Sequence, residues 1–68
     1  MKIGDVVMFT DLGRYAKWFY GRIGVITHTS SSRDGKKHCR VQWITGPVEY
    51  HDRLTPYSDF PLSYFEIP

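Results

Sequence analysis

The stretch from Tyr20 to Thr27 constrains the fold more than any other part of the chain. It contains Gly21 and Gly24, each followed within two residues by a β-branched apolar residue. Glycine has no Cβ atom, so it lets a strand coil tightly or lets a neighbouring backbone pass close by. A straight strand needs no such device, whereas the long second strand of a small barrel has to curve through two sheets. The stretch therefore predicts a curved strand over residues 22–29.

Four other segments have the composition of strands, and they cover residues 5–10, 37–44, 48–54 and 64–67. Residues 37–44 alternate most clearly between apolar and polar side chains, which is typical of a half-buried strand. The face that we expect to be buried carries Cys39, Val41 and Trp43, packed beside Val7, Ile26 and Phe65, and the opposite face carries His38, Arg40 and Gln42. On the last strand we expect Phe65 and Ile67 to point inward.

Glycine, proline and serine mark the connections between these segments. Asp34-Gly35 predicts a type I′ turn at the tip of a hairpin over residues 30–37, because both central residues of that turn need positive φ. Residues 55–61 contain two prolines and predict a loop, which ends in a short 3₁₀ turn at Pro61-Leu62-Ser63. No segment has the length and period of a long helix. We therefore expect one all-β domain over residues 1–68, a five-stranded small barrel with a short 3₁₀ turn before its last strand.

The size and composition of the chain narrow the classes of protein to which it can belong. A 68-residue domain has a small core, and its 11 aromatic residues (two Trp, five Tyr and four Phe) compensate by burying large areas. The single cysteine, Cys39, cannot form an internal disulfide, and we expect it to be a small buried apolar residue. This cysteine usage and the lack of a leader-like or membrane-spanning run favour a cytoplasmic protein.

The positive charge is concentrated in the middle of the chain. The whole chain has a net charge of +2, but residues 14–40 hold seven basic residues against Asp34 alone. The flanking segments are mildly acidic. Such a distribution can produce one positive face, or it can simply place solubilising cations on hairpin tips.

The segment between the first two predicted strands is the main functional candidate. It has no clear period and is too short for a convincing helix, yet four of the seven residues from Arg14 to Tyr20 are aromatic. Proteins that bind single-stranded nucleic acid combine cations that follow the phosphates with aromatic rings on which bases stack. The predicted nucleic-acid-binding residues are Arg14, Tyr15, Lys17, Trp18, Tyr20 and Arg22, extended by Arg33, Lys36, Lys37 and Arg40 of the hairpin tip. Alternatively, Trp18, Phe19 and Tyr20 cover the core, or the patch docks on a protein.

Catalysis and metal binding have little support in the sequence. His51 and Asp52 are neighbours on a predicted strand and should point to opposite faces, and no serine lies near a suitable base. The candidate metal ligands His28, His38, Cys39 and His51 lack the paired spacing of a structural zinc site. We therefore expect no enzyme activity, metal, cofactor or small-molecule substrate.

Several of these segments together resemble a known class of fold. The elements Gly4-Asp5-x-Val7, Gly21-x-x-Gly24-x-Ile26, Val41-x-Trp43 and Phe65-x-Ile67 are similar to those of Src-homology-3-like small barrels. Within that group the first half of the chain is most similar to KOW-type modules, which commonly bind RNA or contact polymerase and ribosomal proteins. The resemblance implies a non-catalytic binding module, with RNA or single-stranded nucleic acid as the partner, or else another protein.

The end of the chain has a weaker resemblance to true Src-homology-3 domains. The segment Phe60-Pro61-Leu62-Ser63-Tyr64-Phe65 is similar to the proline–tyrosine segment that lines their groove for proline-rich peptides. Carried over, that resemblance implies a peptide groove formed by Pro61 and Tyr64, with Trp18 as a third wall. The chain lacks the acidic first loop and the tandem tryptophans of those domains.

Overall fold

A computed structural model describes all residues, 1–68, and shows a small, mostly β structure. The elements are, in chain order, β1 (Val6–Phe9), α1 (Ala16–Phe19), β2 (Ile23–Ser31), β3 (Lys37–Trp43), β4 (Val48–Tyr50), β5 (Arg53–Thr55), β6 (Tyr57–Pro61), a 3₁₀ turn η1 (Leu62–Tyr64) and β7 (Phe65–Glu66). The predicted all-β class is confirmed. No helix has the length and apolarity that a membrane crossing demands.

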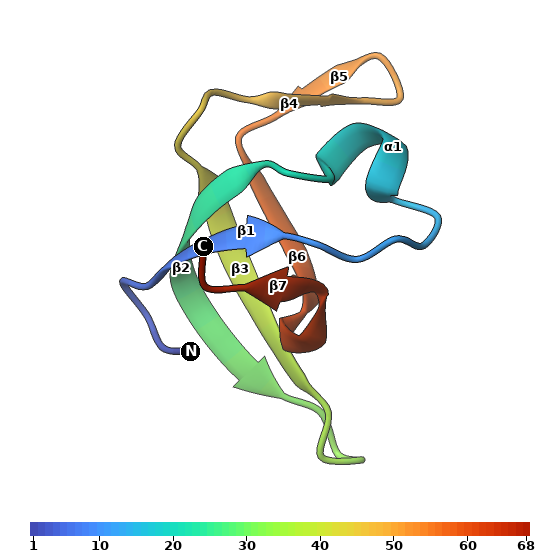
Figure 1. Cartoon of the computed structure of the whole chain (residues 1–68). Coiled ribbons are helices and arrows are strands. Elements are labelled where there is room, and N and C mark those ends of the chain that lie inside the picture. The colour runs from blue at the N-terminus through green and yellow to red at the C-terminus, as the bar shows by residue number, and fades with distance from the viewer.

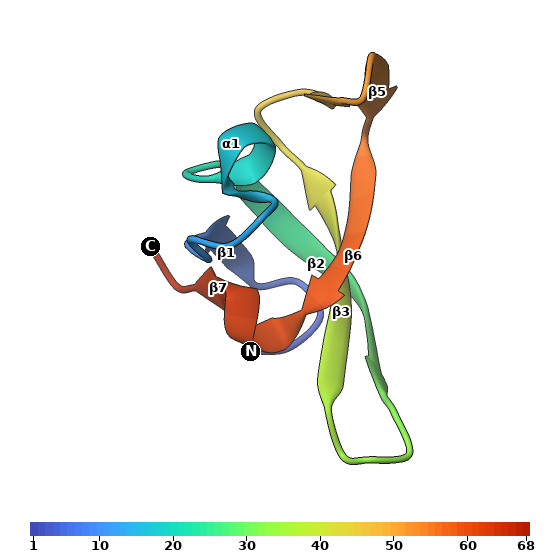
Figure 2. The same cartoon turned by 90° about the vertical axis from the view of Figure 1, so that its right-hand side faces the viewer.

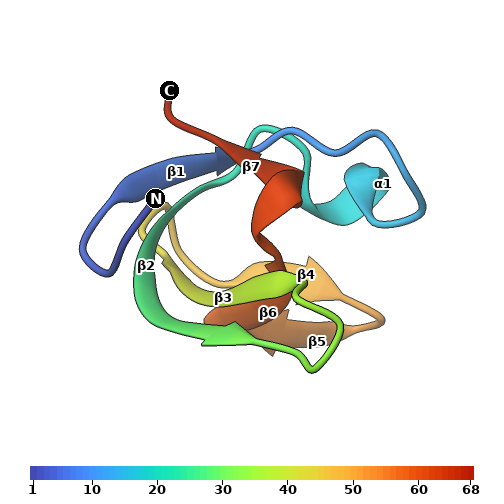
Figure 3. The same ribbon diagram turned by 90° about the horizontal axis from the view of Figure 1, so that it is seen from below.

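Five of the seven strands form one antiparallel sheet in the order β6-β3-β2-β1-β7 (Figure 1). The long strand β2 is central: its first part pairs with β1, through Val6 opposite Val25, and its full length pairs with β3. Seen from below, β2 curves from β1 on one side of the molecule to β3 on the other (Figure 3). The edge strands β6 and β7 do not pair with each other, so the sheet is curled but is not a closed barrel.

Gly24 allows this curvature by bringing two backbones close together. A Cβ atom at this position would lie only 3.1 Å from the carbonyl oxygen of Gln42 and 3.2 Å from side-chain atoms of Val41 and Trp43. Real Cβ contacts are rarely so short, so any larger residue would force β2 and β3 apart. Beyond Gly24 the β2–β3 register shifts between Ile26 and His28, which adds a bulge and increases the local twist.

The core lies inside the curl of the sheet and agrees with the predicted alternation. The buried residues are Val7, Phe9, Phe19, Ile26, Cys39, Val41, Trp43, Val48, Phe60 and Phe65. All six residues that we expected to pack together are among them. Burial raises the pKa of the Cys39 thiol to about 11, with a further contribution from the charge of Asp59, so the thiol is protonated at neutral pH. The inward placement of Ile67 is wrong, because this residue follows the end of β7 and is 60% exposed.

Two predicted segments in the second half of the chain are wrong. Residues 48–54 are not one strand but almost the whole of a hairpin, in which β4 and β5 form a separate two-stranded sheet. Residues 55–61 are not a loop, because most of them form β6, which pairs with β3 along its length. β6 is an edge strand, and an edge strand tolerates proline because one row of its backbone groups needs no partner strand. The 3₁₀ turn predicted over residues 61–63 is present one residue later.

The type I′ turn is found at the tip of the β4–β5 hairpin and not at Asp34-Gly35. Gly35 has φ +83°, but Asp34 does not have a positive φ, and the Ser32 N–H donates to the Lys36 carbonyl (2.8 Å) around a three-residue loop. In the β4–β5 hairpin both central residues, His51 and Asp52, have positive φ, 50° and 60°. The predicted placement of these two side chains on opposite faces of a strand is therefore wrong as well.

The left-handed conformation of Asp52 leads to a testable difference between two small substitutions. A non-glycine residue in this region is strained by roughly 1–2 kcal/mol, and glycine is not. We expect Asp52→Gly to be more stable than Asp52→Ala by about 1 kcal/mol, as measured by urea denaturation. Both variants lack the same carboxylate, so charge effects cancel in the comparison. Equal stability of the two variants would contradict a left-handed residue at this position.

Candidate functional site

The helix α1 is one turn long and is held over the core by one buried ring. The Phe19 N–H donates to the Tyr15 carbonyl (3.1 Å), and the chain then turns back at Gly21, which has φ +80° and donates to the Phe9 carbonyl (2.9 Å). Glycine just after a helix end is favoured because it adopts this left-handed conformation without strain. The Phe19 ring stacks on Trp43 at a centroid distance of 5.5 Å. The segment that we expected to be irregular is therefore partly helical, and one of its aromatic residues is a core residue.

The other aromatic residues of this segment pack against the β4–β5 hairpin. The Trp18 ring lies 4.7 Å from the Tyr50 ring and 4.9 Å from the His51 ring, centroid to centroid. Tyr15 lies 6.1 Å from Tyr50. Tyr15, Trp18 and Tyr50 are each half-buried, so each ring keeps an accessible part. We call this surface, formed by Arg14, Tyr15, Lys17, Trp18, Tyr50 and His51, the aromatic–basic end.

The two cations of the aromatic–basic end lie over its rings and have no acidic partner. The Nζ atom of Lys17 is 4.2 Å from the centroid of the Trp18 ring, and the guanidinium carbon of Arg14 is 5.5 Å from the centroid of the Tyr15 ring. Neither cation forms an ion pair, and the same is true of the nearby Arg22. Exposed cations beside partly open aromatic faces are the combination that single-stranded nucleic acid requires. Tyr20 and Arg22 are also exposed and follow α1 directly.

The tip of the β2–β3 hairpin, which carries Arg33, Lys36 and Lys37, lies at the opposite end of the molecule from α1 (Figure 2), and Arg40 lies farther along β3, opposite Asp59 of β6. The structure thus does not join the two predicted basic segments into one track. One of the four hairpin cations is also engaged, because Arg40 donates to both carboxylate oxygens of Asp59, at 2.9 and 3.2 Å. Lys36 lies 4.0 Å from Asp34, and an exposed pair at this distance contributes little. The bond to Arg40 lowers the pKa of the Asp59 carboxyl. Arg33 and Lys37 remain without an acidic partner.

A second candidate surface is a cavity of about 450 Å³ beside the aromatic–basic end. Its walls include Tyr15, Tyr50, Pro61 and Tyr64, with Phe19 and Phe60 deeper inside, and we call it the tyrosine groove. The structure therefore brings Pro61 and Tyr64 together in one concave surface. Trp18, the third predicted wall of a peptide groove, does not line this cavity and packs against Tyr50 from outside it.

Sequence reasoning missed Tyr50 and His51 because it placed them on a strand and not beside a hairpin turn. The dipeptide His51-Asp52 lacks the asparagine–glycine signal of a type I′ turn, so no local pattern would have found the hairpin. The structure has no cluster of three or more histidine, cysteine, aspartate or glutamate side chains placed to hold a metal ion.

Comparisons with known proteins found no relative of this chain. No protein-family model, no curated protein and no solved structure matches the chain. We therefore infer function from the geometry and chemistry of the aromatic–basic end and the tyrosine groove.

Proposed function

We propose that the chain is a cytoplasmic, non-catalytic binding module that binds RNA or another single-stranded nucleic acid at the aromatic–basic end. The observation that carries the proposal is the pairing of two free cations with two half-buried rings: Arg14 beside Tyr15, and Lys17 beside Trp18. Phosphates would displace the flexible cations from the rings, and the uncovered ring faces would then stack with bases. Alanine substitution of such a stacking ring typically costs about 1–3 kcal/mol of binding energy.

The resemblance to Src-homology-3-like and KOW-type modules remains part of this proposal. Three features support it: the five-stranded curled sheet, the long curved second strand and the 3₁₀ turn just before the last strand. In such modules loops between strands commonly make the contacts with RNA. The aromatic–basic end is formed by two such connections, the β1–β2 segment with α1 and the β4–β5 hairpin.

Titration with mixed-sequence single-stranded oligonucleotides at several salt concentrations tests the proposal. We expect Arg14→Gln/Lys17→Gln to weaken binding for all sequences alike, because interactions with phosphates carry no sequence information. The slope of log affinity against log salt should fall by about 0.7 for each phosphate that the variant no longer neutralises. Trp18→Ala should weaken binding and leave this slope nearly unchanged, since it removes a ring and not a charge.

Arg33→Gln/Lys36→Gln is the matched control, because it removes the same charge from the opposite end of the molecule. We expect this variant to bind almost as tightly as the parent protein. Circular dichroism melting would verify that all variants fold. Substitution of the exposed cations should change stability by less than about 0.5 kcal/mol each, and Trp18→Ala should cost more because the Trp18 ring is half-buried. Equal weakening by both double variants would mean that binding follows net charge alone, and no micromolar binding by the parent at low salt would defeat the proposal.

The tyrosine groove favours one alternative, recognition of a proline-rich peptide. Extended polyproline segments bind in grooves lined by aromatic side chains, because they lose little conformational entropy on binding. Tyr15, Tyr50, Tyr64 and Pro61 form such a lining. Binding of a proline-rich peptide would depend weakly on salt, whereas nucleic-acid binding falls steeply with salt. Amide chemical-shift changes that surround Pro61 and Tyr64 and persist at high salt would favour the peptide.

A further inference from the structure

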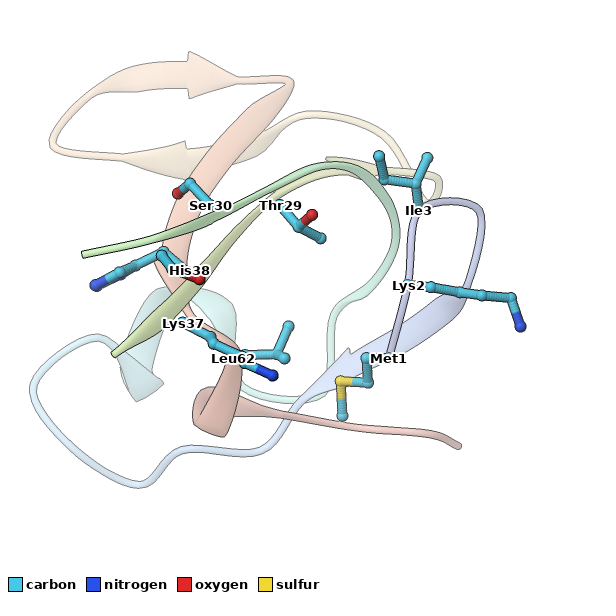
Figure 4. A pocket seen from close by; sticks show the side chains of 9 residues that line it. Met1, Lys2, Ile3, Thr29, Ser30, Lys37, His38 and Leu62 are labelled. Carbon is cyan, nitrogen blue, oxygen red and sulfur yellow. The ribbon is translucent and has the colours of Figure 1, made fainter. Parts of the chain in front are cut away.

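The largest cavity of the molecule, about 860 Å³, lies between the N-terminal residues and the β2–β3 ribbon (Figure 4). We call it the N-terminal groove; its polar lining consists of Lys2, Thr29, Ser30, Ser31, Lys37 and His38. In Figure 4, Ser30, Lys37 and His38 lie on one side of the groove and Lys2 on the other. Neither the aromatic–basic end nor the tyrosine groove includes Lys2, Lys37 or a residue of β2.

Backbone hydrogen bonds place the N-terminal segment beside β2 and so create the groove. The Gly4 N–H donates to the Ile26 carbonyl (2.8 Å), and the Lys2 N–H donates to a carboxylate oxygen of Asp5 (2.9 Å). These bonds turn residues 1–4 back along the sheet. The opposite wall is the part of the β2–β3 ribbon that extends past the core.

The face of the ribbon that carries the core residues becomes polar at this point. Thr29 lies directly opposite Cys39 of the core, so the two side chains are on the same face of the ribbon. Side chains on one face of a strand recur every second residue, so Ser31 is on this face as well. Lys37 lies directly opposite Ser31. Two hydroxyl groups and an ammonium group thus lie where the sequence alternation would otherwise place apolar side chains.

Every charged side chain that lines the groove is a cation. Lys37 has no acidic partner within 4.0 Å. Lys2 has only Asp5, at 4.0 Å, and an exposed pair at this distance contributes little. A groove that offers positive charge and several hydroxyl donors, with no carboxylate among its walls, is complementary to an anion with several acceptor oxygens.

We propose that the N-terminal groove binds a phosphate group, with Lys37 supplying the charge and Thr29 and Ser31 the hydrogen bonds. The phosphate belongs either to a small phosphate ester or to a nucleic-acid backbone, since the chemistry of the group is the same in both. This site is separate from the aromatic–basic end, and the proposal does not depend on the proposed function.

Amide chemical-shift titrations with inorganic phosphate, adenosine monophosphate and a mixed eight-nucleotide DNA strand test this proposal. We expect saturable shifts centred on Thr29, Ser31 and Lys37, with a dissociation constant for the small ligands of about 1 mM, which corresponds to roughly 4 kcal/mol. Lys2→Gln/Lys37→Gln should weaken binding about tenfold. Arg33→Gln/Arg53→Gln removes the same charge from exposed residues outside the groove and should leave the affinity within about twofold of the parent.

Each outcome of these titrations decides the proposal. Saturation by adenosine monophosphate would identify a phosphate-ester site, and saturation by the DNA strand alone would identify a backbone site. The proposal is overturned if no ligand gives saturable shifts in the groove, or if both double variants weaken binding equally. Amides of Lys17 and Trp18 report on the aromatic–basic end in the same spectra, so failure of one site is visible separately from failure of the other.

Discussion

Replacing Trp43 by alanine should unfold the protein or bring it close to unfolding. Trp43 is buried, stacks on Phe19 and donates a hydrogen bond from Nε1 to the Ser58 hydroxyl (3.0 Å). Removing a buried tryptophan side chain costs about 3–5 kcal/mol, and a core of this size seldom supplies more than about 3–5 kcal/mol in total. Urea denaturation followed by far-ultraviolet circular dichroism would measure the decrease in stability.

Tyr57→Ala provides the matched control, because it also removes an aromatic ring from the main sheet. Tyr57 lies on β6 opposite Gln42 but is 54% exposed. We expect this variant to be destabilised much less than Trp43→Ala. A Trp43→Ala protein that melts within a few degrees of the parent would contradict the assignment of Trp43 to the core.

Replacing Phe19 by alanine should have a similarly large effect on stability, and a functional effect as well. The Phe19 ring contacts Phe60 at a centroid distance of 5.0 Å and Phe9 at 5.8 Å, in addition to Trp43. Its removal should cost about 3–5 kcal/mol. Because Phe19 is the one fully buried side chain of α1, the same change would loosen the packing of Tyr15 and Trp18 against Tyr50.

The milder variant Phe19→Leu separates these two effects, since it retains most of the buried volume. We expect it to fold, to bind single-stranded oligonucleotides more weakly than the parent, and to keep the parent's salt slope because no cation is removed. Tyr20→Ala, at the next position, removes a ring that is 56% exposed and should change stability by less than about 0.5 kcal/mol. Unchanged oligonucleotide binding by Phe19→Leu would contradict the role of α1 as the support of the aromatic–basic end.

The strands of the first two thirds of the chain could be predicted from the sequence because their signals are local. Burial on a strand alternates with period two, so Cys39, Val41 and Trp43 could be assigned to one face without knowing what covers them. The need for Gly24 could be predicted in the same way, since a curved β2 requires a close backbone approach wherever it crosses its neighbour.

Only the tertiary structure decided the features that depend on pairing between segments distant in the sequence or across a turn. Residues 57–61 form a strand only because β3 offers them a free edge. Their own composition does not predict a strand, because Pro56 precedes them and Pro61 is their last residue. The turn at His51-Asp52 is left-handed because β4 and β5 pair on either side of it, which offsets strain that the isolated dipeptide would avoid.

The same distinction holds for the candidate sites. The sequence identified Arg14, Lys17 and Trp18 by residue type, and these residues do share one surface. It could not show that the β2–β3 hairpin carries its cations to the far end of the molecule, nor that Tyr50 and His51 join Trp18. Residue type determines which chemistry a side chain can perform, but the distance between segments remote in sequence is set by how the sheet curls.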